Sequence, residues 1–286
     1  MIPTSFDYVR AGSLKETLNL LAAGDGTKII AGGHSLLPMM KFRLVQTPRL
    51  VDISRLEELR GITEHKKGAR IGATTTYAEL ATSPILRERC PVVAEVAAEI
   101  ADLQVRNRGT LGGGLAHADP ASDMPAVMLA LDAEFELRSK KAGKRSVKAR
   151  EFFKGPFATA MTEDELFTGI VLGGMGRTAA AYESFDQAAS GYALVGVCAV
   201  VARKRTAIAA ITVAFTGLGE VQFLSPAFDR LVDTKGDRAT LAQAALEAVK
   251  GVEIAGDLHA PAEYRRHLAQ VAATRAVQKA YERAGA

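Results

Sequence analysis

Two glycine-rich segments in this sequence combine residue types and spacing that could hold a phosphate group. The first glycine segment, residues 31–38, reads AGGHSLLP, and the second glycine segment, residues 109–114, reads GTLGGG. Because glycine has no Cβ, its main chain can approach an anionic ligand closely and can adopt a positive φ. A hydroxyl lies beside each set of glycines, at Ser35 and at Thr110. We therefore interpret the segments as two halves of one binding site for a nucleotide pyrophosphate.

Neither segment matches the glycine pattern of a Rossmann fold or a P-loop. The closest approach to G-x-G-x-x-G is at Gly217 and Gly219, but its sixth position is Gln222, and Pro226 argues against a following helix. The alternative interpretation of the two glycine segments is a pair of tight turns without a ligand. The pattern alone leaves both interpretations open.

The histidines and cysteines do not form a catalytic or metal-binding set. The ring of His34 could donate to a phosphate or ribose oxygen, or it could cap its own turn, and a structural hydrogen bond is the simpler role for His117. No group of residues has the spacing of metal ligands. Cys90 and Cys198 are the only cysteines, and their apolar surroundings indicate buried, reduced thiols. An iron–sulfur cluster usually needs four thiolates, so this chain cannot hold one by itself.

Composition and charge indicate a soluble globular protein. The 286 residues are 48% hydrophobic and 24% charged, with a net charge of +4, and are enough for two compact domains. The dense basic cluster at residues 140–150 contains no aromatic side chain, so we interpret it as a solvated hairpin and not as a nucleic-acid surface. No signal peptide or transmembrane segment is visible. We expect a cytoplasmic protein, either free or held at the inner membrane face by a partner.

The first glycine segment is expected to lie in a small α/β layer formed by residues 1–55. Residues 13–16, SLKE, form a capping box, and the leucines that follow them before Gly24 predict an amphipathic helix with a glycine stop. Strands are expected at residues 6–9, 28–31 and 50–53.

After residue 55 the pattern predicts short strands and helices. A second capping box lies at residues 76–79, and Ser122 or Asp123 can cap a helix that begins near Pro125. Strands are expected at residues 59–63, 69–73, 133–138, 146–147 and 165–172, and a helix at residues 91–101. The glycine-rich run at residues 173–176 marks the expected domain boundary. The next strands are expected at residues 179–185, 192–203 and 206–216, and two helices at residues 238–250 and 261–283.

Four stretches of the chain resemble a known family. They are AGGHSLLPMMKFRL at 31–44, IGATTTYAEL at 71–80, QVRNRGTLGGGLAHADPASDMPAV at 104–127 and ASGYALVGVCAVV at 189–201. Together they resemble the FAD-binding medium subunit of xanthine-oxidase-type molybdenum hydroxylases, and most closely the aerobic carbon monoxide dehydrogenase branch. The resemblance covers essentially the whole chain.

The resemblance implies an α+β fold. The expected arrangement is a two-part FAD-binding domain of the PCMH or vanillyl-alcohol-oxidase type over residues 1–176, with subdomains at about 1–55 and 56–176. A smaller α+β domain of the carbon monoxide dehydrogenase flavoprotein type follows over residues 177–286, with a three-stranded antiparallel sheet and helices.

The resemblance also implies which residues bind FAD. It places Asp123 near the sugar portion, Tyr192 against the isoalloxazine ring and Phe167 near the cofactor, although Asp123 could also be only a helix cap and Phe167 only a core residue. The remaining positions are Ala31, Gly32, Gly33, His34, Ser35 and Leu36 in the first glycine segment, and Thr110, Leu111, Gly112, Gly113 and Gly114 in the second.

The function implied by the resemblance is that of an electron-transfer subunit. A large subunit with a molybdenum cofactor and a small subunit with [2Fe-2S] clusters would be the partners, in a dimer of heterotrimers, and the FAD would pass electrons to an acceptor such as a quinone. Many relatives carry a lysine or arginine where this chain reads ESFDQ at residues 183–187. This departure weakens the case for NAD as the acceptor.

Two other interpretations remain open at this stage. A self-contained FAD-dependent oxidase or reductase would need a substrate base near the flavin, and no residue set plainly supplies one. A cofactor-free assembly subunit would keep the fold without FAD, but the intact glycine segments argue against it.

Overall fold

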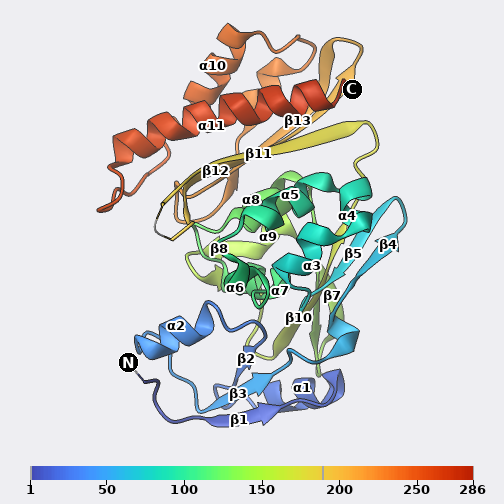
Figure 1. Cartoon of the computed structure of the whole chain (residues 1–286), viewed down its shortest axis with the longest axis vertical. Coiled ribbons are helices and arrows are strands. Elements are labelled where there is room, and N and C mark those ends of the chain that lie inside the picture. Colours follow the sequence, from blue (N-terminus) through green and yellow to red (C-terminus); the bar gives the residue numbers. More distant parts are fainter. Residues whose placement is uncertain (1, 189, 286) are drawn as a thin grey trace.

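A computed structural model describes residues 2–188 and 190–285, so Ala189, the first residue of the fourth resembling stretch, lies outside it. Three sheets follow one another along the long axis of the molecule, from the N-terminal part to the C-terminal part (Figure 1). We name them the N-terminal sheet, the middle sheet and the C-terminal sheet. This arrangement agrees with the predicted α+β class.

The N-terminal sheet is small and parallel, with strand order β1-β3-β2. Its helix begins at the predicted cap, because the Ser13 hydroxyl accepts the amide of Glu16 at 3.1 Å. The reciprocal bond of a capping box is not formed, since the Glu16 carboxylate accepts the amide of Gly12 at 2.7 Å and not that of Ser13. The elements are β1 (Asp7–Arg10), α1 (Leu14–Leu21), β2 (Lys28–Ile30), α2 (Leu36–Lys41) and β3 (Arg49–Asp52).

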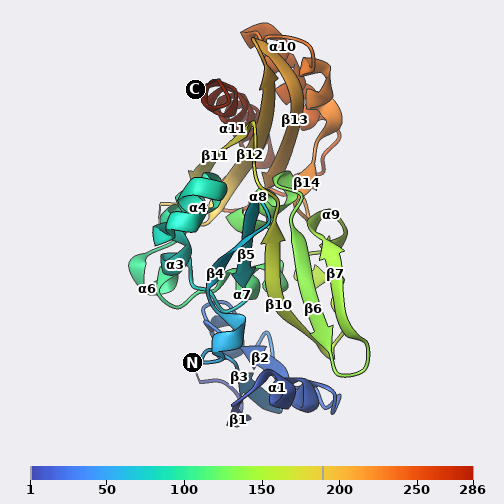
Figure 2. The same ribbon diagram turned by 90° about the vertical axis from the view of Figure 1, so that its right-hand side faces the viewer.

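The middle sheet has five antiparallel strands in the order β4-β5-β10-β6-β7. Strand β6 alternates strictly, so Phe135 and Leu137 are buried while Glu134 and Glu136 are only partly covered. Helices α3 and α6 lie to one side of these strands (Figure 2). The strands are β4 (Ile62–His65), β5 (Gly68–Gly72), β6 (Glu134–Ser139), β7 (Gly143–Lys148) and β10 (Glu165–Leu172), and a small separate hairpin pairs β8 (Phe153–Gly155) with β9 (Ala158–Thr159).

The helices of the middle part cover this sheet and fill the space toward the C-terminal sheet. Helix α8 is buried on every side, as expected of a helix whose residues 124–130 are all apolar. The predicted capping box at Thr76 is present and opens α3. The helices are α3 (Tyr77–Thr82), α4 (Pro84–Arg89), α5 (Pro91–Glu99), α6 (Leu103–Arg106), α7 (Leu111–His117), α8 (Asp123–Ala130) and α9 (Ala149–Phe152).

The C-terminal sheet is antiparallel, with strand order β11-β12-β13-β14. The three predicted strands form its long part, and β14 adds a short edge that the sequence did not predict. Helix α11 packs on β11 and β12, and α5 and α8 approach the sheet from the middle part (Figure 1). The elements are β11 (Thr178–Asp186), β12 (Ala193–Lys204), β13 (Ala207–Thr216), β14 (Phe223–Leu224), α10 (Arg238–Ala248) and α11 (Ala262–Arg283). No helix of residues 2–188 or 190–285 is both long enough and apolar enough to span a bilayer.

One buried arginine ties α11 to the strand ends near the middle part. Arg265 donates to the carbonyl oxygens of Leu194 at 2.8 Å and Gly217 at 3.2 Å, and to the Asp257 carboxylate at 2.6 Å. Its side chain is buried, so these carbonyls have no easy replacement donor.

We expect the Arg265→Met substitution to lower the free energy of unfolding by about 1–3 kcal/mol, because buried carbonyl oxygens lose their donor. Urea denaturation of the whole chain measures this change. Arg238→Met, at an exposed position at the start of α10, is the control and should unfold like the unsubstituted chain. An unchanged unfolding midpoint for Arg265→Met would show that the three contacts contribute little.

Candidate functional site

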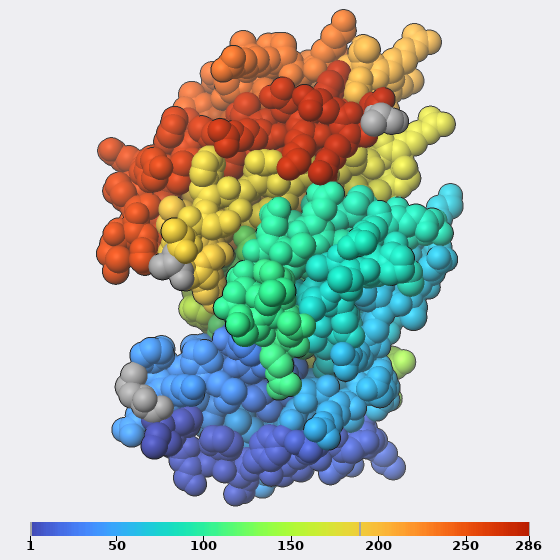
Figure 3. Space-filling view, in the orientation of Figure 1, coloured from blue at the N-terminus to red at the C-terminus, as the bar shows by residue number. Residues whose placement is uncertain are grey.

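A cavity of about 750 Å³ lies where the three parts of the chain meet. The N-terminal part supplies the first glycine segment, the middle part supplies α7 and the start of α8, and the loop before β12 supplies Tyr192. The surface is hollowed between the blue N-terminal atoms and the green and yellow atoms beyond them (Figure 3). All the residues that the sequence predicted for the site line this cavity except Leu111, which is fully buried in the core.

The first glycine segment presents main-chain amides that the protein itself does not use. Within the described part of the chain, no acceptor is paired with the consecutive amides of residues 33–36, which line the cavity. Gly33 has a φ of +75°, a conformation that other residues rarely adopt. Ser35 precedes α2, but its side chain makes no capping hydrogen bond. This segment can therefore surround an anion with donors.

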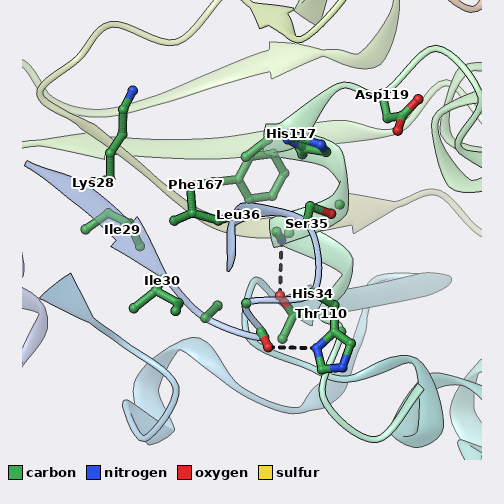
Figure 4. Close-up of a pocket in the computed structure, with 18 of the residues that line it drawn as sticks. Lys28, Ile29, Ile30, His34, Ser35, Leu36, Thr110, His117, Asp119 and Phe167 are labelled. Carbon is green, nitrogen blue, oxygen red and sulfur yellow. Dashed lines mark hydrogen bonds between the residues drawn. The ribbon is translucent and has the colours of Figure 1, made fainter. Parts of the chain in front are cut away.

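The His34 ring turns back onto its own segment. Nδ1 lies 2.9 Å from the carbonyl oxygen of Gly32, and a carbonyl only accepts, so Nδ1 carries the proton (Figure 4). In the neutral ring Nε2 is then an acceptor, and it could not donate to a phosphate. The turn-capping role that the sequence left open is the one that this geometry describes.

The second glycine segment is not the open loop that the sequence predicted. Residues 111–117 form α7, and the Thr110 hydroxyl caps it by accepting the Gly113 amide at 3.2 Å (Figure 4). None of its glycines has a positive φ. The amides of its residues 111–114 are also occupied, since Leu111 donates to Thr75, Gly112 to Ala73 and Gly114 to Thr110. The expectation that the three consecutive glycines offer bare amides is therefore wrong.

Close packing explains the glycines of this second segment. A Cβ at Gly112 would lie 2.7 Å from the main chain of Ala73, and a Cβ at Gly114 would lie 2.3 Å from the Tyr77 hydroxyl oxygen. The first glycine segment touches the same region, because a Cβ at Gly32 would lie 2.2 Å from the carbonyl oxygen of Arg108. The glycines bring three backbones together and leave a smooth wall beside the cavity.

The cavity has few positive charges. Lys28 is the only lysine or arginine that lines it within the described residues, against the acids Asp119, Asp123, Glu163 and Glu165. Glu165 is already paired with Arg145. An anionic ligand in this cavity would therefore depend mainly on main-chain amides, such as those of residues 33–36 and Thr110, which have no acceptor among the described residues.

Asp123 is a partly buried acid of the site that contacts the C-terminal sheet. Its Oδ1 accepts the Tyr182 hydroxyl at 2.5 Å, so a residue of β11 contacts the first residue of α8. Burial raises the pKa of Asp123 to about 6, and the nearby acids Asp186 and Glu99 raise this pKa as well, whereas the hydrogen bond from Tyr182 lowers it. Its carboxyl group is thus poised to change protonation near neutral pH.

The two aromatic residues predicted for the site differ in exposure. Tyr192 is 45% exposed and follows Gly191, which has a φ of +70°. The Tyr192 carbonyl oxygen accepts the Gln187 amide at 2.8 Å, which holds the turn closed. Phe167 lines the cavity but is almost fully buried, with ring centroids 5.3 Å from Phe135 and 5.7 Å from Phe152. Phe167 is therefore a core residue with one side at the cavity.

Sequence reasoning missed two tyrosines. Tyr77 is buried at the cavity wall, and its hydroxyl has no hydrogen-bond partner among the described side chains, so it is a donor available to a ligand. Burial raises the pKa of Tyr77 well above the usual range and keeps this hydroxyl neutral. Its position in the capping box gave no sign of this role. Tyr182 was missed because its contact with Asp123 joins residues far apart in the sequence.

Comparison with known protein families gives matches to both halves of the chain. The family described as "FAD binding domain in molybdopterin dehydrogenase" matches residues 4–172, and the family described as "CO dehydrogenase flavoprotein C-terminal domain" matches residues 180–280. The first match covers more than half of the chain.

Named relatives match most or nearly all of the chain. The carbon monoxide dehydrogenase medium chain of Hydrogenophaga pseudoflava is 39% identical over 287 residues, which cover 99% of each chain. The glyceraldehyde dehydrogenase medium chain of Sulfolobus acidocaldarius is 40% identical over 223 residues, 78% of this chain and 79% of that protein. A solved structure of the H. pseudoflava carbon monoxide dehydrogenase, which lacks the Mo-pyranopterin moiety of its molybdenum cofactor, matches with a TM-score of 0.95 and 38% identity over 99% of both chains.

These matches confirm the resemblance inferred from the four sequence stretches and the α+β fold that it implied. The chain belongs to the family of FAD-binding medium subunits of carbon monoxide dehydrogenase-type molybdenum hydroxylases.

Proposed function

We propose that this chain binds FAD in the central cavity and serves as the electron-transfer subunit of a molybdenum hydroxylase complex. The observation that carries this proposal is the run of free amides at residues 33–36 on the wall of a cavity with little positive charge. A pyrophosphate fits such a wall because it accepts several hydrogen bonds at once. The cavity volume of about 750 Å³ is also within the range of small-molecule sites.

Each part of the wall has its own role in this proposal. The free amides of the first glycine segment hold the pyrophosphate, Asp123 accepts from or donates to the sugar portion, and Tyr192 lies against the isoalloxazine ring. Tyr77 adds a neutral donor. The other members of the site shape the wall, namely Ala31, Gly32, Thr110, Gly112, Gly113, Gly114 and Phe167, with Leu111 fixing α7 from the core.

The cysteine content supports a division of labour between subunits. Cys90 and Cys198 are both buried and free, and burial raises their pKa values to about 11 and about 12. Two such thiols cannot bind a [2Fe-2S] cluster, which needs four ligands. When bound, FAD supplies chemistry that exchanges electrons singly or in pairs. We therefore propose that electrons arrive from the clusters of a small subunit and leave to an external acceptor such as a quinone.

The proposal also covers the partner subunits and the substrate of the complex. A large subunit with the molybdenum cofactor would bind substrate, and the complex would be a dimer of heterotrimers in the cytoplasm or at the inner membrane face. Relatives of similar identity bear the names of carbon monoxide and glyceraldehyde dehydrogenases, so this subunit does not define the substrate. The division into residues 1–176 and 177–286, with the first part split near residue 55, belongs to the proposal as well.

We expect the purified chain to show flavin absorption bands and to turn over no substrate until a molybdenum-containing subunit is added. The visible spectrum and an activity assay, each made before and after addition of the partner subunits, measure this. Turnover by the isolated chain would favour a self-contained oxidase or reductase. A chain that stays colourless after FAD addition, with and without its partners, would favour a cofactor-free assembly subunit.

We expect the Gly33→Ala substitution to release most of the flavin. Alanine at a φ of +75° costs about 1–2 kcal/mol, and the strain displaces the free amides beside it. Gly143→Ala is a matched control, because Gly143 has a φ of +73° in the β6–β7 turn, far from the cavity lining. The measurement is the ratio of bound FAD to protein together with the unfolding midpoint. Equal flavin content in the two variants would contradict the role of the first glycine segment.

A further inference from the structure

The segment that carries two of the four acids of the cavity, Asp119 and Asp123, is held by the C-terminal sheet. Residues 119–123 connect α7 to α8, and Asp119, Ser122 and Asp123 line the cavity. The bonds that fix this segment from outside come mainly from β11, β13 and the turn after β13. We call Tyr182, Thr216 and Gln222 the clamp residues, because each one donates to the segment.

Thr216 and Gln222 hold the first part of the segment. The Thr216 hydroxyl lies 2.8 Å from the carbonyl oxygens of both Pro120 and Ser122. The Gln222 amide donates to the carbonyl oxygen of Asp119 at 2.7 Å and approaches the Thr216 hydroxyl at 3.4 Å. Both side chains are buried, so water cannot easily replace them.

The neighbouring backbone adds a further bond. The Gly217 amide donates to the Pro120 carbonyl oxygen at 2.9 Å, and its φ of +79° places it close to the main chain of Leu194. Within the segment, the Asp119 side chain accepts the Ala121 amide at 2.9 Å and therefore stabilises its own turn. The position of the turn relative to the cavity is set from outside, by the C-terminal sheet.

Tyr182 holds the end of the segment. Its hydroxyl donates to Asp123 at 2.5 Å; the Tyr182 side chain is buried and Asp123 is partly buried. The other titratable groups that act on Asp123 are Asp186 of β11, Glu99 of α5, Tyr77 of α3 and Tyr192. None of them is a cation, so Tyr182 is the side chain that favours the ionised carboxylate.

We infer that the clamp residues Tyr182, Thr216 and Gln222 are positioning residues for FAD, which make the C-terminal sheet part of the cofactor site without contacting the cofactor themselves. The inference rests on the proposed function of the cavity. A ligand site that is already ordered binds more tightly than one that must be ordered on binding, so loosening the segment weakens FAD binding.

Thr216 provides the first test, with FAD titrated into the full chain after removal of bound flavin. Thr216→Val keeps the shape but removes the donor, and we expect the dissociation constant for FAD to rise about tenfold. Thr216→Ser keeps the hydroxyl and should bind FAD within about twofold of the unsubstituted chain. Thr234→Val is the control, because Thr234 donates to the Leu231 carbonyl oxygen in the same part of the chain without contacting residues 119–123.

Tyr182 provides a second test that a merely structural role would not pass. The hydrogen bond from Tyr182 lowers the pKa of Asp123, so Tyr182→Phe should raise it further above about 6. The pH at which FAD affinity changes should therefore move upward in Tyr182→Phe, whichever protonation state binds FAD more tightly. Asp123→Asn should remove this inflection.

The outcomes separate the inference from the function on which it rests. An unsubstituted chain that binds no FAD would contradict the proposed function and the inference together. An unsubstituted chain that binds FAD, with Thr216→Val equal to Thr216→Ser and no shift of the pH profile in Tyr182→Phe, would contradict the inference alone. A loss of affinity in Thr234→Val equal to that in Thr216→Val would also overturn it, since general destabilisation would then explain both.

Discussion

The proposed cofactor site depends on a run of main-chain amides, those of residues 33–36, that have no acceptor in the described part of the chain. Buried or partly buried amides normally find a partner in the protein, and an unpaired one is costly unless water or a ligand completes it. The partly buried Gly33, Ser35 and Leu36, together with the exposed His34, leave four such amides for water or a ligand at the wall of the cavity. The positive φ of Gly33 and the uncapped start of α2 at Ser35 are the local features that keep these donors available.

The rest of the cavity wall makes that arrangement possible by close packing. The second glycine segment has satisfied its own hydrogen bonds as α7, and its small residues let Ala73 and Tyr77 come near. The main chain of Arg108 packs directly against Gly32, where a side chain would not fit. The first glycine segment therefore supplies hydrogen-bond donors, and the second supplies a closely packed surface. The sequence had suggested the same role for both.

Much of the fold could be predicted from the sequence because local signals and global structure agree. The caps at Ser13 and Thr76 open helices as predicted, the second as a full capping box, and strand β10 has the predicted limits of residues 165–172. Helix α7 was missed because three consecutive glycines have low helix propensity, and only the Thr110 cap and the packing on Ala73 and Tyr77 favour the helix. The predicted site residues other than Leu111 line one cavity. The contacts of Tyr182 and Thr216 could not be predicted, since they join the C-terminal sheet to residues about 60 or more positions earlier.

Backbone hydrogen exchange with and without FAD tests the central claim most directly. The amides of residues 33–36 have no acceptor among the residues that the structure describes, so they should exchange rapidly alone and become protected when FAD is added. The amides of residues 111–114 already have acceptors, so they should be protected in both states. Bound FAD with unchanged exchange at residues 33–36 would contradict the claim that bare main chain in the first glycine segment holds the cofactor.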